Sequence, residues 1–362
     1  MDPIAPDYEG ACVTGLLPAL LGLERAAWLP PGVEGAESVV LLVLDGLGAH
    51  ALDDHPRAVP LLRSFPGGTI TTVAPSTTAS ALTSIATGLA PARHGIIGYR
   101  MLVGGAVLNV LRWQSSEGHP PDPFDVQRHQ AFRGREVPVV TKAEFRKSGF
   151  TRAHLREGRF VGWHTESGLV EHCRRLVEAG ERVVYAYYAG VDAVAHEYGL
   201  LDGFFERELA AVDDLADRLL SALPRSAALV VTSDHGQVHL DGDSWLRLDD
   251  VAEMVEVYAG DGRFRALYAR KGAARELLEV ARESYGHVAW VRSRAELLDD
   301  GWLGEGATGS VPGRIGDVVL AAREPVAFVD PTFPKEAKLR SGHGSLTPDE
   351  MLVPLLAHRG RA

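Results

Sequence analysis

Three aspartates follow apolar runs that are typical of buried β-strands. Asp45 follows VVLLVL, Asp234 follows ALVVTS, and Asp192 comes two residues after VVYAYYAG. Because the carboxyl ends of parallel strands lie at one edge of a sheet, we expect these carboxylates to meet there. Three such charges repel one another strongly unless a cation neutralises them. Each Asp could instead cap the helix or turn that follows it.

Three histidines favour the metal-site interpretation. His196 follows Asp192 by four residues, which places both side chains on one face of a helix. His235 follows Asp234 directly, and His343 lies between two glycines in SGHGSL. Three carboxylates with three imidazoles would suit a pair of divalent ions. Zinc is the most natural choice for these ligand types, with Mn²⁺ or Mg²⁺ as alternatives.

A cluster of hydroxyl groups lies where a helix is expected to begin. The stretch APSTTASALTSIATGLAPARHGIIGY, residues 74–99, carries five Ser or Thr side chains between Ser76 and Thr83. One of them could be a nucleophile, provided that a metal ion activates it, because a hydroxyl group attacks poorly at neutral pH. They could equally be helix caps. Composition alone does not decide between these interpretations.

Short β-branched runs alternate with amphipathic helical stretches, which predicts an α/β fold with a mostly parallel central sheet flanked by helices. The expected strands are 38–45, 68–75, 181–190, 226–234 and 316–322, and the expected helices are 13–23, 78–87, 169–180 and 204–223. Such a sheet would bring the strand-end aspartates to one edge.

Two regions fit this pattern less well. Residues 100–165 are rich in Arg, Gly and Pro and have weak periodicity, so they are interpreted as an irregular insert. Residues 243–312 contain two strand-like runs around the helical GAARELLEVARES, which predicts a small α+β insertion that caps the site. The catalytic core is then expected to comprise residues 1–240 and 313–362.

Composition limits the partners of the chain. The 362 residues carry a formal net charge of −11 and are 46% hydrophobic, values of an acidic globular protein with a sizeable core. Duplex DNA and other polyanions are not expected partners, because nucleic-acid-binding domains usually have a basic face. A small phosphorylated substrate stays compatible with the charge, since bound cations can reverse the local sign. The oligomeric state is not evident from the sequence.

Cysteine usage and the apolar segments indicate the compartment. The two cysteines, Cys12 and Cys173, form no CxxC motif and are interpreted as small buried hydrophobic residues. The apolar stretch 13–23 is too short to span a bilayer and contains Gly and Pro, so it predicts a core helix. We therefore expect a cytoplasmic protein that does not act at a membrane.

Five motifs in this order resemble the alkaline phosphatase superfamily: LVLDGLG, PSTTASALTSIATGLAPARHGIIGY, GVDAVAHEYG, TSDHGQ and SGHGSLTPDEMLVPLL. Within that superfamily the chain is most similar to the type I nucleotide pyrophosphatase/phosphodiesterase branch. The resemblance covers about residues 37–100, 181–240 and 315–357. It implies an alkaline-phosphatase-like core.

The resemblance also implies roles for single residues. In that branch the nucleophilic Thr precedes the Thr of a TGL triplet by nine residues, which gives Thr78 here, with Thr77 as the alternative if the spacing is off by one. A covalent phospho-threonine would form on it. By the same resemblance, one metal ion would be held by Asp45, Thr78, Asp234 and His235, and the other by Asp192, His196 and His343.

The chain departs from the branch at one position. Diesterases of the branch usually carry an Asn three residues after the nucleophile, where this chain has Ala81. The expected activity is hydrolysis of phosphodiester or pyrophosphate bonds in a small substrate, for which a nucleotide is one candidate. A phosphomonoesterase, a phosphonate (C–P) hydrolase or a mutase of the same superfamily is the alternative. A non-catalytic binding module is a remote alternative.

Overall fold

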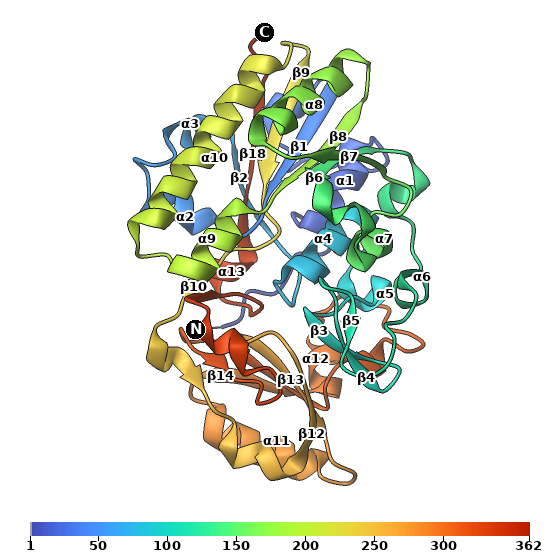
Figure 1. The fold of residues 1–362 in the computed structure, drawn as a ribbon, viewed down its shortest axis with the longest axis vertical. Helices are drawn as coiled ribbons and strands as arrows, with labels where there is room; N and C mark the ends of the chain where they lie inside the picture. The colour runs from blue at the N-terminus through green and yellow to red at the C-terminus, as the bar shows by residue number, and fades with distance from the viewer. Residues whose placement is uncertain (1) are drawn as a thin grey trace.

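A seven-stranded sheet forms the centre of the molecule in the computed structural model, which describes residues 2–362 (Figure 1). The strand order is β2-β18-β9-β1-β8-β6-β7. The strands span Ser38–Leu44 (β1), Gly67–Thr71 (β2), Pro138–Lys142 (β6), Arg159–Trp163 (β7), Val183–Tyr188 (β8), Ala227–Thr232 (β9) and Leu352–Arg359 (β18). All neighbours from β9 to β7 pair in parallel, whereas β18 is antiparallel to both β2 and β9.

Helices cover both faces of this sheet, as predicted. All residues of β1 are buried, and successive side chains enter opposite hydrophobic clusters. Val39, Leu41 and Val43 pack on the side of α1 and α4, and the alternate residues pack on the side of α8 and α10. These helices span Val13–Leu20 (α1), Thr78–Thr87 (α4), Glu166–Glu178 (α8) and Gly203–Ala222 (α10). The predicted α/β fold class is therefore confirmed.

A second, antiparallel sheet lies below the main sheet in the view of Figure 1. Its order is β12-β13-β15-β14, and one face packs against α11. The elements span Val255–Gly260 (β12), Phe264–Ala269 (β13), Ala289–Ser293 (β14), Val318–Ala322 (β15), Ala274–Tyr285 (α11) and Arg294–Asp299 (α12). The expectation that 316–322 is a strand of the parallel sheet is wrong, because β15 pairs with β13 and β14 instead. The second unit therefore takes a strand from beyond residue 312.

The region 100–165 also contributes more than an irregular insert. Its strands β6 and β7 complete one edge of the main sheet, with β7 outermost. Its first part forms a small sheet of Arg100–Val103 (β3), Ala106–Asn109 (β4) and Gln114–Ser115 (β5). The sequence hides β6 and β7 because each has only five residues between Gly-, Arg- and Pro-rich segments.

The remaining helices are short and mostly serve as connections. They span Ala49–Asp54 (α2), Pro60–Ser64 (α3), Pro91–His94 (α5), Pro123–Val126 (α6), Gly149–His154 (α7), Gly190–Tyr198 (α9) and Pro348–Met351 (α13). Two-residue ladders join Val238–His239 (β10) to Ser341–Gly342 (β17) and Trp245–Leu246 (β11) to Ala327–Phe328 (β16). The cysteines Cys12 and Cys173 are buried free thiols. Within residues 2–362, no helix combines the length and apolar character needed to cross a membrane.

Candidate active site

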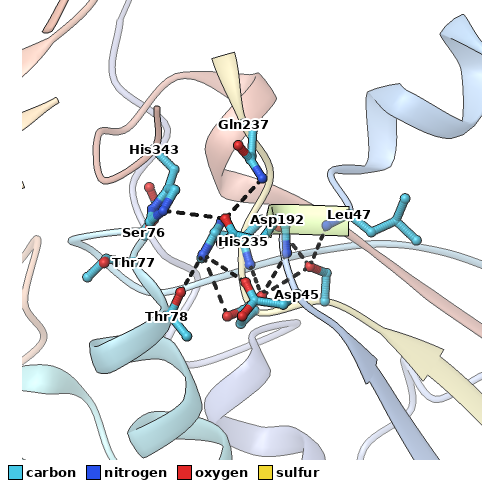
Figure 2. Close-up of polar contacts among 12 residues, drawn as sticks. Asp45, Leu47, Ser76, Thr77, Thr78, Asp192, His235, Gln237 and His343 are labelled. Carbon is cyan, nitrogen blue, oxygen red and sulfur yellow. Dashed lines mark hydrogen bonds and ion pairs between the residues drawn. The ribbon is translucent and has the colours of Figure 1, made fainter. Parts of the chain in front are cut away.

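The carboxyl edge of the main sheet gathers the seven residues that the sequence suggested as nucleophile and metal ligands. Asp45 follows the last residue of β1, and Asp234 with His235 lies two residues beyond β9. The loop after β8 leads into α9, which carries Asp192 in its first turn and His196 in its last. Thr78 begins α4, and His343 directly follows β17. Figure 2 shows the side chains of Asp45, Thr78, Asp192, His235 and His343 close together at this edge.

Three of these residues form a buried triad, Asp45, Asp234 and His235. The Nε2 atom of His235 lies 3.4 Å from Asp45 Oδ1 and 3.6 Å from Asp234 Oδ2. The Thr78 hydroxyl lies 3.1 Å from the same nitrogen (Figure 2). The ligand atoms of the triad lie within 4.8 Å of one another, which is close enough for one metal ion to contact all of them.

The other three form an open triad, Asp192, His196 and His343, whose side chains are partly exposed. Asp192 Oδ1 lies 3.3 Å from His196 Nε2 and 3.7 Å from His343 Nε2. The ring of His343 stacks on that of His235 with centroids 3.7 Å apart, so the two triads are neighbours. The predicted grouping of the six residues therefore agrees with the geometry.

Hydrogen bonds fix the same tautomer in all three rings. In each histidine Nδ1 contacts a backbone carbonyl oxygen, which can only accept, so Nδ1 carries the proton. The contacts are His196 to Ser341 at 3.1 Å, His235 to Gly236 at 3.0 Å and His343 to Ser76 at 3.0 Å. Each Nε2 atom then presents a lone pair toward the carboxylates, which is how metal-ligating histidines are usually oriented.

The buried carboxylates of Asp45 and Asp234 are better suited to bind a metal ion than to lie side by side without one. Asp45 Oδ1 and Asp234 Oδ2 are buried and have no hydrogen-bond partner among residues 2–362. Burial, together with the charges of Asp234 and Asp192, raises the pKa of Asp45 well above its usual value. Burial also raises the pKa of Asp234. A divalent cation would satisfy both orphaned oxygens and offset the repulsion.

Supporting contacts that sequence reasoning missed hold the ligands in place. Gln237 Nε2 donates to Asp192 Oδ1 at 3.0 Å, and the hydroxyl of Tyr187 donates to Asp45 Oδ2. Gly46, at φ +78°, approaches so closely that a Cβ there would lie 2.4 Å from Gln237 Nε2. Gln237 belongs to the TSDHGQ motif, so its proximity was foreseeable, whereas nothing in the sequence indicated Tyr187.

The two candidate threonines have different partners. The Thr78 side chain faces His235, whereas the Thr77 side chain points away from that ring (Figure 2). The Thr77 hydroxyl donates to Asp261 Oδ1 at 3.0 Å. Asp261 lies in the turn between β12 and β13 and also accepts the backbone N–H of Tyr99 at 3.3 Å. The second sheet thus supports the start of α4 directly.

Two cavities open beside Thr78 and Asp192. The larger measures about 450 Å³, and we call it the basic chamber after Arg112 and Lys335, the two exposed cations in its lining. Trp245 and Phe333 also border it, and its acidic lining residues are the partly exposed Asp192 and the buried Asp261 and Glu336. The smaller, which we call the apolar chamber, measures about 250 Å³ and is bordered mainly by apolar side chains of α4, α7, β8 and the segment 141–155. Thr78 and Asp192 line both, so a group bound at Thr78 could extend into either.

Two residues of the stretch 74–99 do not reach the site. Ala81 is completely buried in α4 and lines neither chamber, so its methyl group takes no part in the site. His94 is buried away from the carboxylates: its Nδ1 accepts the N–H of Ile96 and its Nε2 lies 2.8 Å from the Ser84 hydroxyl. His94 is therefore a structural histidine.

Comparisons with known proteins show the family and the fold of the chain. The family model described as type I phosphodiesterase / nucleotide pyrophosphatase matches residues 39–346. Among curated proteins, none matches the chain. Among solved structures, murine ectonucleotide pyrophosphatase/phosphodiesterase 5 superposes with a TM-score of 0.69 at 16% identity, covering 90% of this chain and 88% of that one.

Two further solved structures contain ligands. An inactive Thr-to-Ala variant of the same murine protein, in complex with AMP, gives a TM-score of 0.68 at 15% identity and covers 89% of this chain and 87% of that one. Phosphonoacetate hydrolase from Sinorhizobium meliloti, in complex with phosphonoacetate, gives 0.63 at 19% identity and covers 90% of this chain and 91% of that one. At these identities the likeness establishes the fold.

Proposed function

Because the chain belongs to the type I phosphodiesterase / nucleotide pyrophosphatase family, which comprises phosphate ester hydrolases, we propose that it hydrolyses phosphodiester or pyrophosphate bonds of a small substrate. Thr78 is the proposed nucleophile, and two divalent ions are the proposed cofactors. The observation that carries this proposal is the position of the Thr78 hydroxyl, 3.1 Å from His235 Nε2 at the junction of the two triads.

The proposed ligands divide between the two triads. Asp45, Asp234 and His235, together with the Thr78 hydroxyl, would hold one ion, and the open triad would hold the other. Mixed carboxylate and imidazole ligands favour zinc. Such ions supply Lewis acidity that lowers the pKa of a coordinated hydroxyl group and offsets charge on a phosphoryl group.

The residues of the chain then account for the remaining steps. Thr78 Oγ1 attacks phosphorus, its proton is lost to solvent, and the bond from phosphorus to the leaving oxygen breaks, which yields a phospho-threonine ester. Water hydrolyses this ester and regenerates the hydroxyl. At the first turn of α4 the backbone N–H groups lack helical acceptors, so they favour a phosphoryl group bound at Thr78.

The substrate class is proposed from the neighbours and from the chambers. One neighbour was solved with AMP and another with phosphonoacetate, so a nucleotide or another small phosphorylated molecule is the proposed substrate. The basic chamber favours a substrate with an additional anionic group, because Arg112 and Lys335 are exposed there and form no salt bridge among the described residues. That feature also suits a phosphonate hydrolase, which is the second candidate.

Trapping the covalent intermediate tests the proposal. Rapid acid quenching during turnover of p-nitrophenyl thymidine 5′-phosphate, followed by peptide mass spectrometry, should find a nucleotidyl group on the peptide that contains Thr78. A parallel incubation with phosphonoacetate distinguishes the second candidate, which would release inorganic phosphate from the C–P bond. Turnover of neither substrate, with two ions bound per chain, would contradict both proposals.

A further inference from the structure

A buried ion pair links the second sheet to the loop that carries His343. Asp192 and His196 of the open triad lie in α9, whereas His343 follows β17 in the loop, residues 343–347, that leads to α13. The position of the His343 ring therefore depends on what holds this loop. The inference below concerns that support and rests on the function proposed above, which assigns a metal ion to the open triad.

The side chain of Glu350, in α13, organises the loop. Glu350 is completely buried, and its Oε1 atom accepts the backbone N–H of Ser345 at 2.9 Å. Its Oε2 atom accepts the hydroxyl of Thr347. Ser345 lies two residues after His343, so this carboxylate fixes the backbone on the carboxyl side of the ligand. A carboxylate that is buried in this way needs a counter-charge.

Arg263 supplies that charge from the turn between β12 and β13. Its Nε and Nη2 atoms donate to the two carboxylate oxygens of Glu350, each at 2.8 Å. Such a bidentate pair fixes orientation as well as distance. The Nη1 atom donates to the carbonyl oxygens of Glu324 and Val326, both at 2.8 Å, in the segment that follows β15. The guanidinium group is thus held by the second unit on one side and holds Glu350 on the other.

The second unit supports the loop at two further points. A Cβ atom at Gly342, which directly precedes His343, would lie only 3.0 Å from Arg263 Cδ, so the arginine stem packs closely against β17. The Ser345 hydroxyl donates to the carbonyl oxygen of Ala322, at the end of β15, at 2.6 Å. The loop therefore rests on the second sheet along most of its length.

We propose that Arg263 is a positioning residue for the metal ion of the open triad. Its ion pair with Glu350 holds the loop so that His343 Nε2 meets Asp192 and His196. The second sheet is then part of the metal site although none of the proposed ligands lies in it. Because coupling between two events is reciprocal, an ion in the open triad should in turn stabilise the packing of the β12–β13 turn against the loop.

The substitution Arg263→Lys tests the proposal. It keeps the positive charge but replaces the planar fork with a point charge, which cannot make all of the arginine's contacts at once. We expect the Zn²⁺ affinity of the open triad to fall about tenfold or more, the scale expected when a supporting contact is lost, while the buried triad keeps its ion. Competition with a chelator measures both affinities, and His343→Ala identifies which step belongs to the open triad.

Two outcomes of this titration count against different claims. An unchanged affinity of the open triad in Arg263→Lys would overturn the inference alone. A wild-type protein that binds no zinc would overturn the proposed function and this inference with it.

Arg265→Lys is the matched control. Arg265 lies two residues further along β13 and is also completely buried, and its hydrogen bonds among residues 2–362 go to Ala259, Phe328 and Glu336. The control therefore alters a buried ion pair of the same sheet without touching the His343 loop, and it should leave the zinc affinity of the open triad unchanged. An equal loss in both variants would indicate general loosening of the second sheet and would contradict a specific role of Arg263.

Hydrogen exchange tests the reciprocal effect and does not depend on turnover. Zinc loading should slow amide exchange in residues 255–269 of the wild-type protein, and this slowing should shrink in Arg263→Lys. Glu350→Gln removes the other charge at constant size and should weaken the slowing similarly. The double variant should lose little more, because both substitutions act through one contact. Equal slowing in the wild type and the variants, or additive losses, would overturn the proposal.

Discussion

The two triads of the active site use the same residue types in different surroundings. The side chains of Asp45, Asp234 and His235 are at most 3% exposed, whereas those of the open triad are 10–20% exposed. The buried triad is carried by the ends of adjacent parallel strands, and the open triad by a helix and a loop. The buried triad also holds the two oxygens that lack partners.

This difference in burial predicts different roles for the buried triad and the open triad. A buried cluster of carboxylates is unfavourable without a cation, so it should bind its ion tightly and hold Thr78 in a fixed position. The open triad is partly exposed and borders the basic chamber, so under the proposed function the phosphoryl group and water would enter and leave there. We therefore expect substitutions in the two triads to differ in their effects on stability more than in their effects on turnover.

The largest expected effect is the loss of turnover when either triad loses a carboxylate. Asp45→Asn and Asp192→Asn should each lower kcat by more than about 10³-fold, since each removes a charged ligand. Only Asp45→Asn should raise the melting temperature of the chelator-treated protein, because it removes a buried charge next to Asp234. Calorimetry measures the melting temperature of each variant, and elemental analysis verifies that the chelator has removed the metal. Equal stability effects would show that burial does not distinguish the triads.

Substitutions of the two threonines should differ by orders of magnitude. Thr78→Ala should lower hydrolysis of a p-nitrophenyl diester by about 10³-fold, the scale expected when a covalent nucleophile is removed. Both ions should stay bound, because their other ligands remain. Thr78→Ser should keep much of the activity, and Thr77→Ala should cost far less. Full activity of Thr78→Ala would instead indicate direct attack by water.

A smaller effect should follow when a ligand loses its supporting contact. Gln237→Ala removes the N–H that is donated to Asp192 and should lower the metal affinity of the open triad by roughly 10–100-fold. The hydrogen bonds of this side chain among the described residues go to Asp192 and Ser341, so the buried triad should keep its ion. Competition with a chelator, monitored by metal content, should therefore remove one ion from this variant before the other. Simultaneous loss of both would indicate a coupled site.

The smallest expected effect concerns a buried histidine outside both triads. Burial lowers the pKa of His94 to about 3, with His129 and Arg314 contributing. Between pH 6.5 and 3 the unfolded chain therefore binds a proton at this position that the folded chain does not, so stability falls as the pH falls, by up to ~1.4 kcal/mol per pH unit. His94→Gln should reduce this slope and leave the metal content unchanged. An unchanged slope would contradict the neutral, structural assignment.

The sequence was most informative where ligands are adjacent to strand ends. Asp45, Asp234 and His235 follow continuous apolar runs, and Asp192 with His196 shares a helix, so spacing alone brought them together. The strand at 318–322 was misplaced because VVLAA is buried on both faces, a pattern that does not distinguish a parallel from an antiparallel sheet.

The chambers could not be predicted for a different reason. Arg112 and Lys335 are more than two hundred residues apart, and only tertiary packing brings them to one cavity. The identity of the metal ions, the phospho-threonine and the cytoplasmic location stay predictions, because each depends on chemistry or cell biology that lies outside the packing of the chain. The division into a catalytic core of residues 1–240 and 313–362 and an insertion of residues 243–312 also stays a prediction.

The position of β18 has a consequence for biosynthesis. This strand lies between β2 and β9, and the six other strands of the main sheet precede it in the chain. Since a ribosome delivers a protein from its N-terminus onward, β2 lacks a neighbouring strand in the main sheet until residues 352–359 have left the exit tunnel. His343, nine residues earlier, arrives only slightly sooner. A nascent chain therefore contains Thr78 and most of the proposed ligands early. Its hydrolytic site is complete only after His343 and β18 have been translated.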